Sequence, residues 1–334
     1  MTVLVTGGSG LVGSHVIEAL RAAGERVRAL VREPSRAVVE RLGAEPVVGD
    51  VTDADTWRRA ATNIDAIVHA AAIVTRAVPL ERYLAVNVGG TRLAAEAARR
   101  ARARLVHVSS VAVYGRNPCD ARVIEDAPFQ ELSPQDFYAR SKRMAEEVLR
   151  EETSRDAVAV AVIRPNVIYG ERDRLFTPRV VRLARFGFAP VIGRGTNRLS
   201  CVYAGNVAAA IVAALGARLG GFRAFHATED APPWLTQREF VAAFATALGR
   251  QARVVRVPPT AARVVVSLGT AWRRVLHAGR YAGLGRAAVA FATGDNPYVT
   301  DRARTELGWR PPVTTGDAIS RTARWFAANE TPGT

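Results

Sequence analysis

The feature that most restricts how this chain can fold is the regular alternation of short apolar runs with amphipathic segments through its first 165 residues. The runs are rich in β-branched residues and nearly continuous, as strands covered on both faces of a sheet must be. Strands that alternate with helices pair in parallel, so the pattern predicts an α/β fold with a doubly wound parallel sheet. We expect strands at Thr2–Thr6, Arg26–Val31, Glu45–Val48, Ala66–His69, Leu105–Ser109 and Val158–Arg164.

Helices are predicted between these strands, notably at Leu11–Ala23, which Gly24 would end, and at Leu84–Ala103. After Pro165 the regularity decreases, and glycine and proline punctuation predicts loops, at Gly187, Pro190, Gly193 and Gly195. Later helices are predicted at Asn206–Leu215, Thr236–Leu248, Thr260–Leu276, Arg302–Leu307 and Gly316–Ala328.

Composition argues against several classes of protein. The net charge is +15, but the arginines are scattered along the chain without interleaved aromatic residues, so we expect no nucleic-acid partner. The two cysteines, Cys119 and Cys201, have neither metal-ligand spacing nor the density of a disulfide scaffold. No leader and no run of 18 apolar residues is present, so a cytoplasmic protein without a metal is predicted.

A glycine-rich loop follows the first predicted strand and opens the first helix. Its glycines, Gly7, Gly10 and Gly13, have the spacing G-x-x-G-x-x-G. The first permits a tight turn, the second lets the backbone approach a pyrophosphate, and the third lets the helix pack closely on the strand. We therefore expect a bound dinucleotide along this loop, with Ser9 and Leu11 also in contact.

The residues after the second strand bear on the choice between NADP and NAD. An acidic residue there would accept from a ribose 2′-hydroxyl, but this chain has Arg32, which with Arg36 could pair with a 2′-phosphate. NADP is therefore favoured, while Glu33 leaves NAD open and a solvated Arg32 is the plain structural alternative. After the third strand, Asp50 and Val51 are expected near the adenine.

Tyr138 and Lys142 lie four residues apart on a predicted helix, where side chains one turn apart meet. Every basic residue except Lys142 is an arginine, which indicates that a guanidinium would fail at this position. An ammonium is expected to lower the pKa of the phenol so that Tyr138 can exchange a proton with a substrate oxygen. The alternative is an exposed helical pair without a function.

Two hydroxyls, Ser109 and Ser110, end the fifth strand at the sheet edge where ligands of α/β proteins bind. One of them could hydrogen-bond the substrate oxygen, or both could merely cap the following turn. His69 and His107 lie within strands and are interpreted as core residues. Cys119 has no neighbouring base in the sequence, so no thiol nucleophile is expected.

Together these segments resemble the extended short-chain dehydrogenase/reductase superfamily. The motifs that carry the resemblance are the loop at 6–13, the run at 69–72, Asn-Val-Gly-Gly-Thr at 87–91, Ser-Ser-Val-Ala-Val-Tyr-Gly at 109–115 and Arg-Pro-Asn-Val-Ile-Tyr-Gly at 164–170. The resemblance places the active hydroxyl on Ser110. It also implies cofactor contacts for Ala70, Ala71, Ala72, Asn87 and Pro165.

Within that superfamily the second half is most similar to the 3β-hydroxysteroid dehydrogenase and β-keto reductase branch, through the segments at 200–208 and 301–311. Arg198-Leu199-Ser200 departs from the Arg-Asp-aromatic pattern common in nucleotide-sugar enzymes. The resemblance also implies a homodimer. Residues 260–292 could form a lid, pack in the small domain or touch a membrane surface, and membrane contact is the less favoured of these readings.

These observations predict a dinucleotide-binding Rossmann domain at 1–165, to which residues from about 200 to 228 return, and a smaller mixed α/β substrate-binding domain at 166–330. The predicted activity is hydride transfer between NADP(H) and a carbonyl or secondary alcohol of a largely apolar small molecule, such as a steroid-like, β-keto or natural-product compound. A nucleotide-sugar epimerase or dehydratase is the alternative. A non-catalytic cofactor sensor is a further one.

Overall fold

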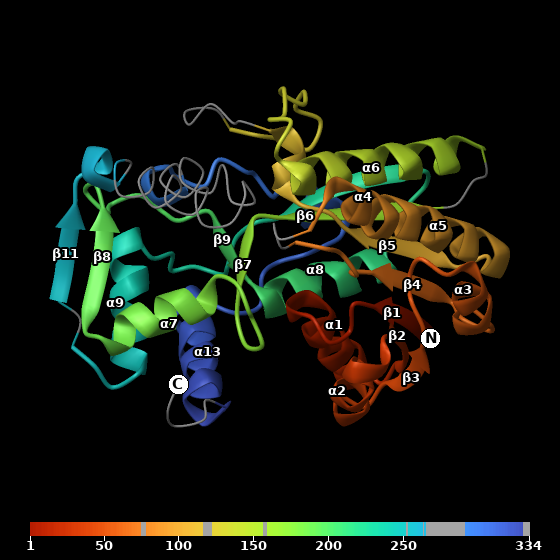
Figure 1. Cartoon of the computed structure of the whole chain (residues 1–334), viewed down its shortest axis with the longest axis horizontal. Helices are drawn as coiled ribbons and strands as arrows, with labels where there is room; N and C mark the ends of the chain where they lie inside the picture. The colour runs from red at the N-terminus through yellow and green to blue at the C-terminus, as the bar shows by residue number, and fades with distance from the viewer. Residues whose placement is uncertain are drawn as a thin grey trace.

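The computed structural model describes residues 1–74, 78–115, 122–155, 159–251, 253–262, 264 and 291–329. Two lobes are visible in Figure 1, with a large parallel sheet in the lobe that contains the N-terminus. Cys119 and nearly all of residues 260–292 lie outside the described residues, as does most of the helix predicted at 260–276.

Seven parallel strands form the central sheet in the order β10-β6-β5-β4-β1-β2-β3. This confirms the predicted doubly wound α/β fold, and the strands of the first half lie within two residues of their predicted bounds. The strands are β1 (Thr2–Thr6), β2 (Arg26–Val31), β3 (Glu45–Val48), β4 (Ala66–His69), β5 (Arg104–Val108), β6 (Val160–Pro165) and β10 (Phe222–Ala227).

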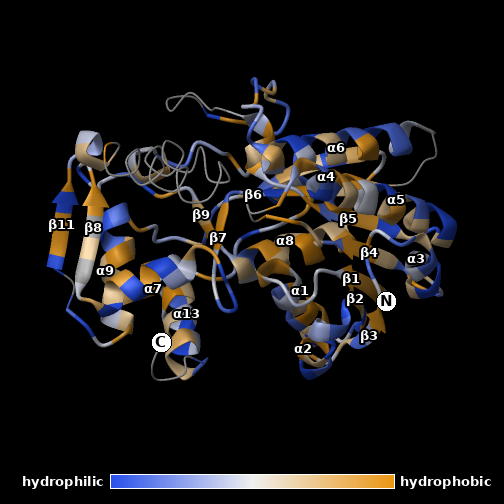
Figure 2. Ribbon diagram, in the orientation of Figure 1, coloured by the Kyte–Doolittle hydropathy of each residue, from blue (hydrophilic) through white to orange (hydrophobic). Residues whose placement is uncertain are grey.

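Helices cover both faces of this sheet, and each face has its own apolar core (Figure 2). One face packs on α1 (Leu11–Ala22) and α8 (Ala204–Gly216), and α12 (Asp301–Glu306) joins the same core. The other packs on α3 (Ala54–Ala60), α5 (Gly90–Ala101) and α6 (Phe137–Arg155). Buried Val, Ile, Leu and Ala side chains fill both layers, which explains the continuous apolar runs in the strands.

Local backbone geometry agrees with the residues at several predicted boundaries. Gly24 follows the end of α1 with φ +76°, a conformation that glycine adopts without steric cost. The predicted helix at 84–103 is instead composed of α4 (Leu80–Tyr83), a π-helical segment (Leu84–Gly89) and α5. Short helices at Glu33–Ser35, α2 (Arg36–Arg41) and Val111–Tyr114 complete this half.

The smaller lobe contains more regular structure than the sequence predicts. Its core surrounds Tyr169, Phe240 and Phe244. The sequence predicts a loop at Pro190, but this residue lies within β8. Among the described residues β8 pairs with β11 alone, so its other edge is unpaired, and proline is tolerated in such an edge strand. The elements of this lobe are β7 (Val167–Tyr169), α7 (Thr177–Arg185), β8 (Phe188–Ile192), β9 (Cys201–Tyr203), α9 (Gln237–Ala247), β11 (Arg253–Val257) and α13 (Thr315–Asn329).

Candidate active site

The strand order places a crevice at the carboxyl ends of β1 and β4, because successive connections leave these neighbouring strands in opposite directions. Gly7 follows β1 with φ +69°, and a Cβ on it would lie 2.8 Å from the Ala71 nitrogen in the segment after β4. A Cβ on Gly13 would lie 2.2 Å from the Gly7 carbonyl oxygen. Both glycines are therefore required for the loop to lie this close to its neighbours.

The N-terminus of α1 faces this crevice with free donors. Its N-cap is Gly10, no side chain caps the helix, and its first turn contains no acidic residue. The exposed N–H groups and the positive end of the helix dipole form an anion site. Ser9 donates to the Ser35 hydroxyl at 3.0 Å, which links this loop to the turn after β2.

The predicted adenosine end lies where β2 and β3 finish. Arg32 is exposed directly after β2. Burial raises the pKa of Asp50, but hydrogen bonds from Thr52 and the nearby Arg32 charge lower it overall. Arg36 contacts Glu40 at 2.9 Å on the same helix, so the described structure leaves Arg32 as the better placed of the two predicted arginines.

Val51, which we predict to lie near the adenine, contributes through its backbone to the neighbouring helices. Its carbonyl oxygen accepts from the Trp57 indole at 2.9 Å, and a Cβ on Gly90 would lie 3.4 Å from this residue. The segment after β3 is thereby held between α3 and the start of α5.

The segment Ala70–Ala72 leaves the end of β4 and is held by Asn87. The Asn87 amide exchanges two hydrogen bonds with the backbone of Ile73, at 2.7 and 3.1 Å, and also donates to Ser141 on α6 at 2.9 Å. Asn87 is fully buried in the π-helical segment, a feature that is frequent at functional sites. The side chain that we expect against the cofactor thus fixes the loop and the helix around it.

Tyr138 and Ser110 meet at this edge of the sheet. Tyr138 stands half-buried on the first turn of α6, and burial raises its pKa to about 12, while a hydrogen bond with Ser110 opposes that rise. The sequence predicts a lowered pKa, but the pKa is raised because the phenol loses solvent, and this effect outweighs any stabilisation of the phenolate by the Lys142 charge. Ser110 also accepts from the Ala112 N–H at 3.1 Å, so it caps the next turn as well as contacting the phenol.

Lys142 lies one turn further along α6 and is almost completely buried. Its ammonium donates to the Val108 carbonyl oxygen at 2.6 Å, at the end of β5. Burial lowers its pKa to about 8, and the charge of Glu146, a further turn along, raises it in part. Among the described residues this ammonium, which has three donors, donates to the Val108 carbonyl oxygen alone, so it retains capacity for acceptors at the crevice.

A buried polar network behind these residues was missed at the sequence level. Arg164 pairs with Glu146 through two hydrogen bonds, at 2.9 and 2.5 Å, with both side chains at most 1% exposed. Ser109 donates to the same carboxylate at 2.6 Å, and Arg164 also donates to the Tyr114 hydroxyl at 2.6 Å. This network fixes α6 against β5 and β6. Glu146 lies four residues after Lys142, and this spacing was the available signal.

His69 and His107 are core residues, in agreement with the sequence. Their rings stack across β4 and β5 with centroids 5.5 Å apart, and His69 contacts the Thr6 hydroxyl at 2.9 Å. Burial, together with the charge of Lys142, lowers the pKa of His69 to about 3 and that of His107 well below its usual value. Both rings are therefore neutral beneath the candidate site.

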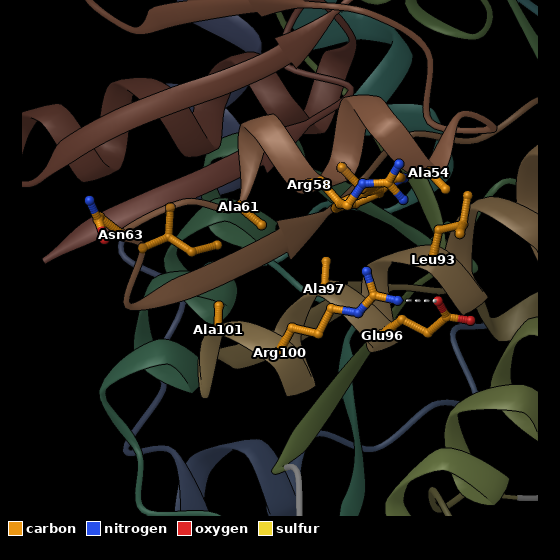
Figure 3. A pocket seen from close by; sticks show the side chains of 11 residues that line it. Ala54, Arg58, Ala61, Asn63, Leu93, Glu96, Ala97, Arg100 and Ala101 are labelled. Carbon is orange, nitrogen blue, oxygen red and sulfur yellow. Dashed lines mark ion pairs between the residues drawn. The ribbon is translucent and has the colours of Figure 1, made fainter.

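Pro165 and a groove between α3 and α5 lie toward opposite edges of the sheet. Pro165, the last residue of β6, is buried at the same sheet edge. A groove of about 500 Å³ between α3 and α5, shown in Figure 3, contains none of the predicted residues. The groove includes Asn63 and Ile64, which precede β4, so it lies toward the opposite edge of the sheet. Among the described residues no cluster of His, Cys, Asp or Glu could hold a metal ion.

Comparison with known proteins agrees with this geometry. Residues 3–224 match the NAD dependent epimerase/dehydratase family. The chain is 32% identical, over 94% of its length and 93% of the relative's, to a 4-hydroxy-2-methyl-3-oxo-4-farnesyl-3,4-dihydroquinoline-1-oxide ketoreductase of Stigmatella aurantiaca. It is 30% identical, over 98% and 90%, to a 3 beta-hydroxysteroid dehydrogenase/Delta 5-->4-isomerase of Mycobacterium tuberculosis.

Among solved structures, the dTDP-glucose 4,6-dehydratase DesIV of Streptomyces venezuelae, with NAD and TYD bound, is similar with a TM-score of 0.73. The two chains share 26% identity, and the match covers 98% of each. The chain therefore belongs to the NAD dependent epimerase/dehydratase family of extended short-chain dehydrogenases/reductases. It is an NAD(P)-dependent enzyme that acts on CH–OH groups.

In the part of the chain that the structure describes, no helix is both long enough and apolar enough to cross a membrane.

Proposed function

We propose that the enzyme transfers a hydride between NADP(H) and a carbonyl or secondary alcohol of a largely apolar small molecule, of steroid-like, β-keto or natural-product type. The observation that carries this proposal is that Ser110, Tyr138 and buried Lys142, one turn along α6 from Tyr138, lie together at the sheet edge that also holds the glycine loop. The ketoreductase and steroid dehydrogenase relatives support the substrate class.

The residues at this edge fit a dinucleotide. The close approach at Gly7 and Gly13 and the uncapped start of α1 would hold its pyrophosphate, with Ser9, Gly10 and Leu11 in the same loop. The segment Ala70–Ala72, Asn87 and Pro165 would border the nicotinamide half, and Arg32, Asp50 and Val51 the adenosine half. When bound, the nicotinamide supplies or accepts the hydride.

The side chains of the chain supply the proton. In the reductive direction the Tyr138 hydroxyl donates its proton to the substrate oxygen, and Ser110 donates a hydrogen bond that holds this oxygen in place. The Lys142 ammonium, which has donors besides the one to Val108, would hold the ribose and stabilise the phenolate that remains. A pKa of about 12 in the described structure means that Tyr138 begins as a protonated acid.

Replacing Tyr138 with Phe tests this role. The Tyr138→Phe variant should retain NADPH affinity within a few-fold, while turnover falls by a factor of about 10² or more, as the loss of a general acid implies. Tyr203→Phe is the matched control, because it removes a buried phenolic hydroxyl that contacts Glu171 instead. Unchanged turnover in Tyr138→Phe would refute the proposal.

We further propose NADP as the preferred cofactor, because Arg32 is exposed at the end of β2 and positively charged. In Arg32→Ser, NADPH affinity should fall about tenfold or more with little change for NADH, since a charge-assisted contact to the 2′-phosphate is lost. Arg36→Ser, whose guanidinium contacts Glu40, should change the ratio less. A wild-type preference for NADH in a cofactor titration would contradict this assignment.

The alternative function is a nucleotide-sugar epimerase or dehydratase, favoured by the 26% identity to the NAD-containing dehydratase. Arg198 begins the segment that departs from the pattern common in nucleotide-sugar enzymes. Its guanidinium lies over the Trp234 ring at 4.1 Å and contacts Glu229 at 3.4 Å, so the side chain is held within the small lobe. A purified enzyme that retains NAD and converts a nucleotide sugar without a net change in nicotinamide absorbance would favour this alternative.

The domain and assembly assignments follow as further proposals. Residues 1–165, with a return over 200–228, would form the cofactor domain, and 166–330 would form most of the substrate domain. The return is supported by α8 and β10, which pack on and extend the large sheet. A homodimer in the cytoplasm is proposed on the family resemblance and the cysteine content, without nucleic acid as a partner.

A further inference from the structure

The positive charge of this protein is concentrated in its second half. Residues 1–173 contain 24 basic and 23 acidic residues, whereas residues 174–334 contain 22 arginines and 8 acidic residues. No acidic residue occurs between Asp173 and Glu229, or between Glu239 and Asp295, and each stretch holds eight arginines. The arginines are spread along the chain, but the acidic residues that would neutralise them are not.

Helix α7 lies in the first acid-free stretch and presents an amphipathic outer face. Arg179, Arg182, Leu183 and Phe186 are exposed at positions i, i+3, i+4 and i+7, which share one side of a helix. Phe186 is 71% exposed and Leu183 is 41% exposed. Phe186 is the most exposed large apolar side chain among the residues the structure describes.

The second acid-free stretch reaches the same corner. The Arg253 N–H, at the start of β11, donates to the carbonyl oxygen of Gly187, the residue after Phe186, at 2.9 Å. Arg253 is exposed and Val255, two residues further along β11, is 39% exposed. This corner lies at the end of the small lobe that is remote from the large sheet (Figure 1).

We propose that this corner, formed by Arg182, Leu183, Phe186 and Arg253, rests on the surface of an anionic lipid bilayer. Phe186 and Leu183 would enter the boundary between headgroups and acyl chains, and the flanking guanidinium groups would contact lipid phosphates. None of these four residues belongs to the segment 260–292. The proposal does not depend on the reaction that the enzyme catalyses.

Charge and shape favour a bilayer over other occupants. A second copy of the chain would bring two strongly positive lobes together, which like-charge repulsion opposes. Nucleic acid would satisfy the arginines but would gain little from the aliphatic Leu183 and Val255. A bilayer offers both a negative surface and an apolar layer beneath it. The arginines of the two acid-free stretches are spread along the chain, as suits contact with an extended negative surface.

Vesicle sedimentation with the full-length enzyme tests the proposal. Wild type should bind vesicles of equal parts phosphatidylcholine and phosphatidylglycerol, but not phosphatidylcholine alone. Binding should weaken between ~0.01 M and ~1 M salt, where the Debye length falls from about 30 to about 3 Å. Phe186→Ser should weaken binding about tenfold through lost apolar burial, and Arg182→Gln and Arg253→Gln about fivefold each.

Two controls separate this corner from general effects. Ile124→Ser removes an apolar side chain that is 53% exposed elsewhere, and Arg41→Gln removes an exposed charge from the other lobe. Both should leave vesicle binding within twofold. The proposal is wrong if wild type ignores both vesicle types at low salt, or if the controls reduce binding as much as Phe186→Ser does.

Other occupants give distinct results that would also overturn the proposal. Dissociation of a dimer by Phe186→Ser in sedimentation velocity, with vesicle binding unchanged, would assign the corner to a second copy. If Phe186→Ser weakened the binding of duplex DNA as much as it weakened vesicle binding, the corner would be assigned to nucleic acid. The exposed positions chosen leave the core intact, and a thermal midpoint within a few degrees of wild type verifies folding.

Discussion

Replacing Lys142 with Met should make the cofactor-free protein more stable at neutral pH while abolishing its activity. The pKa of this ammonium is lowered from 10.5 to about 8 by burial. A difference of about 2.5 pKa units corresponds to about 3.4 kcal/mol by which the charged form is disfavoured in the folded state. Methionine retains the apolar stem and removes the buried charge.

The net gain is smaller than this figure, because the Val108 carbonyl oxygen loses its hydrogen bond from the ammonium, at a cost of about 1 kcal/mol. We therefore expect the free energy of unfolding of Lys142→Met at pH 7 to exceed that of wild type by about 2 kcal/mol. Turnover should be lost, since the proposed mechanism needs the ammonium beside the phenol.

The sign of the pH dependence follows from the same shift. Below pH 8 the folded and unfolded chains both bind the proton, so the advantage of the Met variant is constant. Between pH 8 and 10.5 the unfolded wild type binds more protons than the folded one, so wild-type stability rises with pH by up to about 1.4 kcal/mol per unit. The advantage of the variant should therefore disappear by about pH 10.

Urea unfolding followed by circular dichroism at pH 7, 8.5 and 10 measures this difference directly. Lys142→Arg is the matched control, since it keeps a charge that cannot be lost in this range. It should be less stable than wild type at every pH. If Lys142→Met were less stable than wild type at pH 7, or its advantage did not change with pH, the inferred cost of burying the ammonium would be incorrect.

Two further predictions concern stability. Burial lowers the pKa of three histidines, His69, His107 and His226, so below pH 6.5 the unfolded chain binds more protons than the folded chain. The free energy of unfolding should therefore fall toward pH 4, by about 1.4 kcal/mol per pH unit for each histidine that remains neutral in the folded state. Urea midpoints measured as a function of pH test this. A midpoint independent of pH over this range would contradict it. Gly13→Ala should destabilise by about 2 kcal/mol or more and weaken NADPH binding, because its Cβ would lie 2.2 Å from the Gly7 oxygen. Gly216→Ala, in α8 where the added Cβ would meet no atom within 4 Å beyond the adjoining chain and helix backbone, should instead stabilise by about 0.5–1 kcal/mol in thermal unfolding. Equal effects of the two substitutions would refute the steric argument.

The first half of the fold could be predicted because its strands lie between two helical layers. Burial on both faces demands continuous apolar runs such as Thr2–Thr6, and this signal is strong enough to locate strands within two residues. The segment 84–89 was predicted as ordinary helix. Its apolar pattern does not distinguish a π-helical turn, which here places Asn87 between Ile73 and Ser141.

The second half was less predictable because its elements depend on tertiary contacts. Helix α7 begins at Thr177, contains Pro178 in its first turn and carries arginines, and its short apolar stripe gave no clear period. Within the described part of the chain, strands β8 and β11 pair with each other alone, across 60 residues of sequence, so neither has a local signal. Pro190 in β8 was therefore interpreted as a loop residue.

At the candidate site, the sequence predicted which side chains lie close together but not how burial and charge shift their pKa values. Tyr138, Ser110 and Lys142 do meet at one edge, as spacing and resemblance predict. The direction of the Tyr138 pKa shift was wrong because burial depends on the whole surrounding fold. Glu146 and Arg164 were not predicted as a pair, since they are joined only when α6 packs against β6.

Strand β10 has a consequence for how this protein is made. It lies at the edge of the large sheet and pairs with β6 from Val160 to Pro165, although it is not synthesised until residue 227. A nascent chain that has passed only residue 165 therefore exposes one whole side of β6, with its unpaired backbone groups. The large sheet should therefore first become resistant to protease when residue 227 of the nascent chain has emerged from the ribosome.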